Sequence, residues 1–344
     1  MSPLHHLRHD RNETTLKKHL STSLKVLVSL GLIVYLFLRM DLGQVRIALS
    51  HVNHLYLLPA ALLFLAAMTN SALKWYILLR AQRVVVPFRA ILSYTYVGFF
   101  FNNFLPANVG GDVMRGYGLA RYTERTAEAA ISVIVDRIVG LAAFMVCAAV
   151  SAAVAILFME HTELQGVEVA AVVALGLIVG GFAAMLSRRI RAQLGKVFRW
   201  RPLIPLSSFY QRTSEALDAY RHSYAALAIA FCASLFTLIL TNMTDYLIAQ
   251  SLGGGVALIY IFIFNPIIAF VLLVPVSIGG LGVTQAIYPF FYGLVGVPAS
   301  LAFSISLLKQ LIIYVTSVPG GILWWRGKAG AGETTRHIVE APGT

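Results

Sequence analysis

The chain has 344 residues, 58% hydrophobic and only 12% charged, with a mean hydropathy of +0.76 and a formal net charge of +12. A soluble domain is nearer 45–50% apolar and about 25% charged, so this composition excludes most soluble enzymes, disordered proteins and plain nucleic-acid-binding domains. The apolar residues form long runs instead of alternating one by one, which also excludes a transmembrane barrel. We therefore expect an all-α polytopic membrane protein, with no nucleic acid among its partners and with no cofactor or metal.

Residues 1–23 are polar, and we expect them to form a cytoplasmic tail. The following run, Leu24–Met40, is apolar except for Lys25 and Arg39 at its ends, whose side chains can extend to the membrane interfaces. No small-residue cleavage site follows this run, so it predicts a retained first span and not a secretory signal.

Eight further apolar runs have roughly the length of a membrane span. Several contain or flank proline and paired glycines, so we expect about six to eight transmembrane helices and two broken segments. The runs are Leu55–Leu73, Ala90–Gly111, Ala129–Met159, Val167–Leu186, Tyr224–Gln250, Val256–Val276, Val283–Val297 and Ala299–Trp325.

Positively charged loops predict the orientation, because such loops remain cytoplasmic. Residues 74–89 carry four lysines and arginines, and the connection 187–223 carries eight. Residues 160–166 carry only acidic charge, and residues 251–255 carry none. We therefore expect a bacterial-type inner-membrane protein with the N-terminus, the basic connection and the tail 327–344 in the cytoplasm.

The loop charges also predict two re-entrant segments. Residues 74–89 and 112–128 are both assigned to the cytoplasm, so the chain near 90–122 must enter the membrane, break and return. Near 256–297 the chain must return to the outer side, either as a second hairpin or as two spans. We favour a hairpin, because Val283–Val297 has only 15 residues.

An internal repeat supports this organisation. The segments Leu105–Gly111 and Val274–Gly280 both contain Pro-x-x-x-Gly-Gly, at a constant offset of 169 residues. Each repeat then has an odd number of crossings, so the second must be inverted, as in many secondary transporters. The first repeat covers 24–186, and 224–326 forms the remainder of the second.

Helix breaks within a membrane leave backbone groups that need protein or water as partners. We expect a polar cavity between the two breaks, although tight helix contacts through small residues are the alternative. Asp112 is expected to cap its helix and repel anions, which would favour the second hairpin for a bound anion. The candidate headgroup and cavity residues here are Asn108, Gly110, Gly111, Asp112, Ser277, Gly279, Gly280 and Gln285.

Ionisable residues within apolar runs are further candidates. Asp136, Arg137 and Lys309 would each cost about 2.5–3.5 kcal/mol at the centre of a single membrane helix. In a functional interpretation Arg137 and Lys309 bind a lipid phosphate, and Asp136 serves as a tether or proton carrier. In a structural interpretation these residues form ion pairs, for example Asp136 with Lys309.

Two other charged residues are weaker candidates. Arg115 lies three residues after Asp112, so we expect an ion pair within one helix, with headgroup contact as the alternative. Asp245 is expected near the outer end of its span, where water can reach it.

Four ordered motifs carry a resemblance to a known family: Leu105-Pro106 to Arg115, Asp136-Arg137 to Leu141, Pro275 to Val283, and Pro319-Gly320-Gly321. Over residues 22–326 the chain resembles the transmembrane region of lysylphosphatidylglycerol synthases and the stand-alone proteins that share it. Thr284-Gln285 depart from the charged residues expected in relatives. The resemblance implies a flippase-like domain, here without the aminoacyl-transferase domain.

The expected partners are therefore membrane lipids, either an anionic phospholipid or a polyprenyl-linked lipid. We expect no catalytic residues, since the chain has no P-loop, H-E-x-x-H or G-x-S-x-G motif. Two alternatives remain open: a membrane-embedded transferase acting on a lipid-linked sugar, and a scaffold for a lipid-modifying enzyme or glycosyltransferase.

Overall fold

The computed structural model describes residues 46–47, 49–104, 110–158, 220, 223–272 and 280–339. The tail 1–23, the predicted spans Leu24–Met40 and Val167–Leu186, and most of the connection 187–223 lie outside these residues. The described elements are all helical: η1 (His54–Tyr56), α3 (Leu57–Ala81), α4 (Phe88–Phe104), α5 (Gly110–Thr123), α6 (Thr126–Phe158), α10 (Tyr224–Ser251), α11 (Leu258–Val271), α12 (Val283–Gly293) and α13 (Ala299–Val339).

Four segments in the described part of the chain are long and apolar enough to cross a membrane: His54–Ala81, Thr126–Ala148, Tyr224–Ser251 and Ala299–Arg326. The prediction of an all-α polytopic membrane protein is therefore confirmed. The first of these helices continues past the predicted end at Leu73 to Ala81, and Lys74 faces the bundle with only 7% of its surface exposed.

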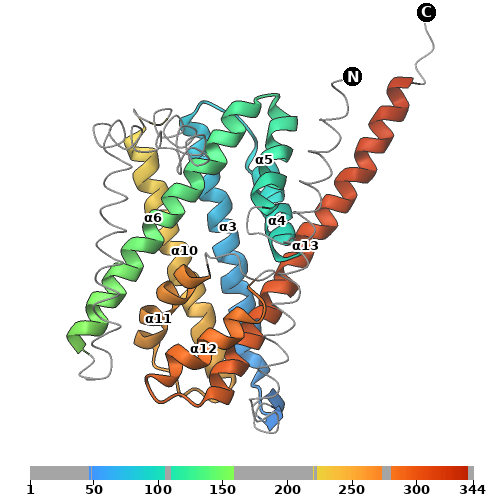
Figure 1. Cartoon of the computed structure of the whole chain (residues 1–344). Coiled ribbons are helices and arrows are strands. Elements are labelled where there is room, and N and C mark those ends of the chain that lie inside the picture. The colour runs from blue at the N-terminus through green and yellow to red at the C-terminus, as the bar shows by residue number, and fades with distance from the viewer. Residues whose placement is uncertain are drawn as a thin grey trace, which may run out of the picture.

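The remaining helices are short and form two pairs (Figure 1). Helices α4 and α5 pack together in the half of the bundle where α3 ends and α6 begins, whereas α11 and α12 lie in the opposite half, where α10 ends and α13 begins. With 14 and 11 residues, α11 and α12 extend about 21 and 16 Å, less than the ~30 Å hydrocarbon core. Neither forms the full span considered as the alternative for 256–297.

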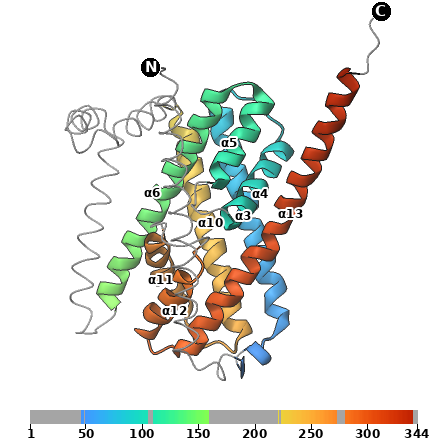
Figure 2. The same ribbon diagram turned by 45° about the vertical axis from the view of Figure 1, so that its right-hand side comes forward.

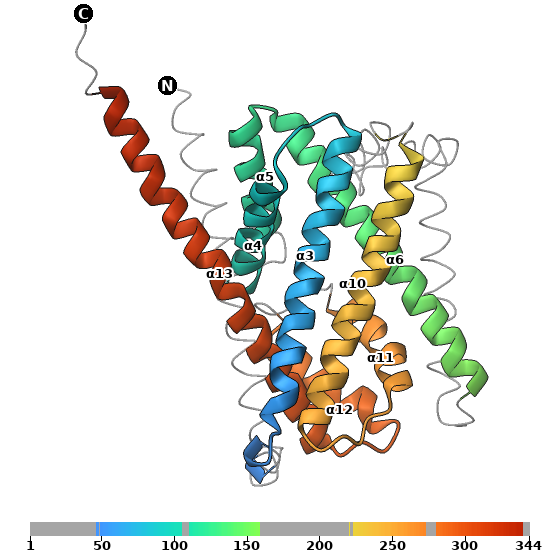
Figure 3. The same ribbon diagram turned by 180° about the vertical axis from the view of Figure 1, so that it is seen from behind.

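The two sets of four helices are arranged as an inverted repeat. Helices α3 and α10 run side by side through the centre (Figure 3), and α13 packs on α4 as α6 packs on α11. Viewed from another direction, α6 and α13 flank the two hairpins, which lie at opposite ends of the bundle (Figure 2). The Pro-x-x-x-Gly-Gly breaks themselves include residues 105–109 and 273–279, which lie outside the described residues, so their geometry stays a prediction.

Small residues explain how α13 approaches α4 so closely. A Cβ atom added to Gly320 would lie 2.0 Å from the carbonyl oxygen of Tyr96, so any larger residue would push the two helices apart. Next to this contact, the rings of Trp324 and Phe101 meet edge to face with centroids 5.2 Å apart. The Pro319-Gly320-Gly321 motif therefore serves helix packing.

Candidate functional site

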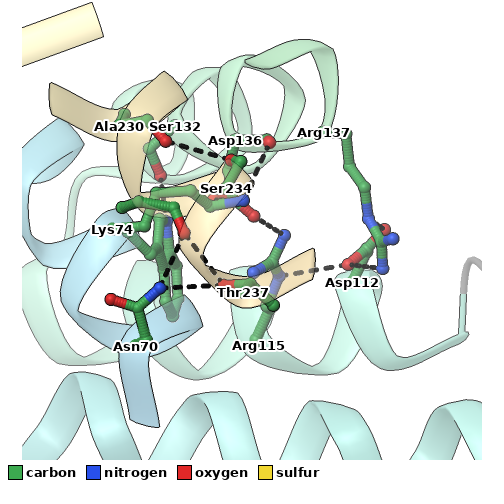
Figure 4. A network of polar contacts seen from close by, with 12 residues as sticks. Asn70, Lys74, Asp112, Arg115, Ser132, Asp136, Arg137, Ala230, Ser234 and Thr237 are labelled. Atoms are coloured by element: carbon green, nitrogen blue, oxygen red, sulfur yellow. Dashed lines mark hydrogen bonds and ion pairs between the residues drawn. The ribbon is translucent and has the colours of Figure 1, made fainter. Parts of the chain in front are cut away.

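Five charged side chains come together beside the first hairpin (Figure 4). They line a cavity of about 550 Å³ that is bordered by α3, α4, α5, α6 and α10 and reaches the end of α11 at Ala269 and the following Leu272. The cluster contains three cations and two anions, so it carries one net positive charge. Its members are Lys74, Asp112, Arg115, Asp136 and Arg137.

Asp136 is the centre of this cluster and is only 3% exposed. Its Oδ2 accepts a hydrogen bond of 2.6 Å from Nη2 of Arg115, and Nζ of Lys74 lies 2.9 Å from its Oδ1. The predicted alternative pair of Asp136 with Lys309 is wrong, because the two residues belong to different halves of the bundle. Two buried cations hold the Asp136 carboxylate between α3 and α5, an arrangement suited to a tether.

Arg115 also forms ion pairs within the protein and is 6% exposed. The expected pair with Asp112 is confirmed, with 3.1 Å between Nε and Oδ1. The guanidinium also lies 5.0 Å from the ring centroid of Trp75, whose indole donates a hydrogen bond of 3.1 Å to Ser132. These contacts fix α5 against α3 and α6 and leave Arg115 little freedom to bind a ligand.

Arg137 differs from the other cations because 52% of its side chain is exposed. Its guanidinium forms a bidentate pair with Asp112, in which Nη2 donates to Oδ1 at 2.7 Å and Nε donates to Oδ2. Arg137 is therefore the cation best placed to meet a ligand that enters the cavity, with Asp112 as its resident partner.

The predicted role of Asp112 as a helix cap is wrong. Helix α5 already begins at Gly110, and the Asp112 carboxylate is directed toward Arg137 and Arg115. The side-chain oxygen of Asn102 accepts a hydrogen bond of 2.8 Å from the N–H of Gly111 instead. One N–H group in the first turn of α5 is thus satisfied from α4.

Gly111 is required by close packing as well as by the cavity that it borders. A Cβ atom at this position would lie 1.9 Å from the carbonyl oxygen of Gly98 on α4. Both interpretations considered from the sequence, a polar cavity and a tight helix contact, therefore apply at the same glycine.

The second hairpin differs from the expectation of a free helix end. Asn108, Ser277 and Gly279 lie outside the described residues. Gly280 adopts a positive φ of 74°, and the side-chain oxygen of Gln285 accepts a hydrogen bond of 2.6 Å from the N–H of Gly282. The N–H of Gly282, which we had expected to be available to an anion, is therefore already bonded to Gln285.

Lys309 belongs to a second polar cluster around Asp245. Its Nζ lies 2.6 Å from Oδ2 of Asp245 and 2.6 Å from the hydroxyl of Tyr288. Asp245 is 1% exposed, so the expectation that water reaches it is wrong. The carboxylate lies inside the bundle because α11, α12 and α13 cover the end of α10.

Sequence reasoning missed Lys74 and Tyr288 as parts of these clusters, and it named Asp245 only as a weaker candidate near water. Lys74 follows directly on an apolar run and was assigned to a loop. The spacing of Asn242 and Asp245, three residues apart and therefore on one helical face, was the available signal for a polar face. Among the described residues, no group of three or more His, Cys, Asp or Glu could hold a metal ion.

Comparisons with known proteins place the chain among membrane proteins. A family model described as the lysylphosphatidylglycerol synthase TM region matches residues 23–320. A UPF0104 membrane protein of Methanothermobacter thermautotrophicus is 25% identical over 292 residues, which cover 79% of this chain and 85% of that protein. Another from Pyrococcus horikoshii is 21% identical over 287 residues, covering 78% and 86% of the two chains. No solved structure matches.

Proposed function

The chain belongs to the lysylphosphatidylglycerol synthase transmembrane-region family, and on this premise we propose that it is a flippase-like lipid transporter. The transported lipid is an anionic phospholipid or a polyprenyl-linked lipid. Its charged headgroup passes through the bundle while its apolar tails remain in the bilayer.

The charged cavity is the observation that supports this proposal. Charged residues within membrane segments usually face an interior cavity and mark a substrate pathway. This cavity has about 550 Å³ and one net positive charge, and it presents the half-exposed Arg137. A guanidinium binds phosphate oxygens through paired hydrogen bonds, so a lipid phosphodiester can replace Asp112 as the partner of Arg137.

The distribution of basic residues supports a cytoplasmic location for one end of the bundle. The end of α3, the start of α6, the start of α10 and the end of α13 lie at the same end (Figure 1). This end carries Arg80, Arg83, Arg89, Arg121 and Arg125. By the positive-inside rule it faces the cytoplasm, and we place the protein in a bacterial-type inner membrane with both termini cytoplasmic.

A vesicle assay with the purified chain tests the proposal. Fluorescent anionic phospholipid is incorporated into proteoliposomes, and its movement between leaflets is followed by chemical quenching of the outer leaflet, without any nucleotide sugar. We expect the wild type to accelerate movement and Arg137→Ala to slow it about tenfold, as the loss of one charged hydrogen bond predicts. Arg125→Ala is the matched control, since Arg125 is an exposed cation outside the cavity.

Four results would count against this proposal. Equal rates with and without protein would refute it, and equal rates in the wild type and Arg137→Ala would remove the assigned cavity from the pathway. A strict requirement for a sugar donor would instead indicate the membrane-embedded transferase. Loss of a neighbouring lipid-modifying enzyme on deletion of this chain, with no lipid movement in vesicles, would indicate the scaffold.

A further inference from the structure

A second buried polar cluster lies in the opposite half of the bundle from the charged cavity. It is formed by Asp245 on α10, Asn265 on α11, Tyr288 on α12 and Lys309 on α13. The proposed headgroup pathway through Arg137 makes no use of these residues. Each of the four helices of the second repeat contributes one side chain, so the cluster connects all four helices.

The two carboxylate oxygens of Asp245 have very different surroundings. Oδ2 accepts hydrogen bonds from Asn265 at 2.6 Å, Tyr288 at 3.0 Å and Lys309 at 2.6 Å. Oδ1 is buried and has no hydrogen-bond partner in the part of the chain that the structure describes. An unsatisfied buried acceptor is unfavourable, so the negative charge of this carboxylate is compensated only by the donors to Oδ2.

Lys309 is the only charged group that faces Asp245 among the described residues. The groups around the carboxylate are Asn242 and Thr244 from α10, Asn265 from α11, Tyr288 and Tyr292 from α12, and Lys309 from α13; from α3 only the carbonyl of Ala60 contacts Thr244. Asp136 in the other half has two cations, so its charge is retained if one of them moves. Asp245 has one, so the departure of Lys309 would leave a buried carboxylate without a facing cation.

Lys309 and Asp245 also differ in their exposure to solvent. The Lys309 side chain is 25% exposed, whereas that of Asp245 is 1% exposed. The Tyr288 hydroxyl lies between them, since it accepts a hydrogen bond from Lys309 at 2.6 Å and donates one to Asp245. Lys309 can therefore move toward water or a ligand, and Tyr288 offers a path by which a proton can reach the carboxyl group.

We propose that Asp245 and Lys309 form a proton-exchange site, in which one proton binds the carboxylate and releases the Lys309 ammonium. Tyr288 takes up one proton from water at its hydroxyl oxygen and passes its own proton to Oδ2 of Asp245, which then no longer accepts a hydrogen bond from Lys309. Lys309 keeps its own protons and loses only its hydrogen bonds to Asp245 and Tyr288, so the site gains one positive charge. The freed ammonium then attracts the lipid phosphate; this last step rests on the proposed transport function, whereas proton binding does not.

Infrared spectroscopy of the full chain in lipid, titrated with acid, tests proton binding without transport. We expect a carbonyl band of a protonated carboxyl group out of water in the wild type. The band should be absent in Asp245→Asn, shifted in Asp245→Glu, and unchanged in Glu124→Gln, which alters an exposed carboxylate. A band of equal intensity in the wild type and Asp245→Asn would overturn the proposal.

A second variant guards against misfolding of Asp245→Asn. In Lys309→Gln the carboxylate loses its only facing cation, so the same band should already be present at neutral pH. A Lys309→Gln protein that is folded but titrates like the wild type would also overturn the proposal.

Coupling is tested in the proteoliposomes by imposing a pH difference. One proton moved per lipid shifts the steady-state lipid distribution about tenfold per pH unit, and Asp245→Asn should show no shift. A wild type that moves lipid without any shift refutes the coupling. An infrared band that depends on Asp245 in a protein that moves no lipid retains the proton site and refutes only the transport function.

Discussion

Asp136 and Lys309 occupy equivalent positions in the two inverted repeats, each ten residues after the first residue of its helix, α6 or α13. Each pairs with a residue of opposite charge near the end of the first long helix of its repeat. That residue is Lys74 in α3 for Asp136 and Asp245 in α10 for Lys309. The two ion pairs are therefore equivalent in place, with their charges exchanged.

A third position extends the equivalence. Arg115 and Tyr288 both lie five residues after the first residue of their helices, α5 and α12. Arg115 contacts Asp136, and Tyr288 contacts Lys309. The first repeat thus has a carboxylate held by two cations, while in the second a neutral phenol accompanies a single ion pair. We infer that the first cluster is the more rigid of the two.

The exchanged charges predict that the second pair can be reversed. Asp245→Lys alone places two cations together, and Lys309→Asp alone places two carboxylates together, so each should destabilise the protein. The double variant restores an ion pair in the order found in the first repeat. We expect a coupling energy of about 0.5–3 kcal/mol from a double-variant cycle of unfolding in lipid. A coupling energy of zero would show that the two positions do not interact.

Removal of the Asp136 charge should be far more costly than removal of Arg137. Asp136→Asn leaves Lys74 and Arg115 buried without their shared carboxylate, which we expect to lower the free energy of unfolding by about 3–5 kcal/mol. Arg137→Ala breaks a pair whose cation is half exposed, for which about 0–1 kcal/mol is typical. The two variants are compared by their midpoints of unfolding in detergent. Equal losses of stability would contradict the finding that Asp136 is buried and Arg137 is half exposed.

The sequence predicted the long spans and the inverted repeat well, because both depend on features that are local in the chain. Apolar runs define the length of a span, and the Pro-x-x-x-Gly-Gly motif marks the repeat, without knowledge of packing. The orientation expected from loop charges stays a prediction. Asp136, Arg137 and Lys309 were also recognised, since each interrupts an apolar run. Some members of the two clusters were therefore predicted, but their contacts with one another were not.

Partner identity could not be predicted, because it depends on how helices rotate against one another. Lys74 and Asp136 are 62 residues apart, and Lys309 and Asp245 are 64 apart. A helix brings residues three and four positions apart to one face, which was enough to predict the pair of Asp112 with Arg115. The spacing of residues within one helix does not show which face of that helix contacts another helix.

Asp112 should compete with anionic lipid for Arg137. In Asp112→Asn the guanidinium loses its bidentate partner and becomes available, so we expect about tenfold tighter retention of anionic phospholipid. Native mass spectrometry of the purified protein with added phosphatidylglycerol measures this retention. Glu128→Gln is the control, since Glu128 lies in the first turn of α6 and does not line the cavity. Weaker retention in Asp112→Asn would show that Asp112 orients Arg137 and does not compete with the lipid.

A methyl group at Gly111 should push apart α4 and α5, the two helices of the first hairpin. In Gly111→Ala the new Cβ would lie 1.9 Å from the Gly98 carbonyl oxygen, and neither backbone can move without parting α4 from α5. We expect a loss of about 1–3 kcal/mol, measured as unfolding in detergent. Gly293→Ala is the matched control, because a Cβ there meets no atom within 4 Å and alanine favours the helix. If Gly111→Ala keeps wild-type stability but retains less anionic lipid, the glycine serves the cavity and not the helix contact.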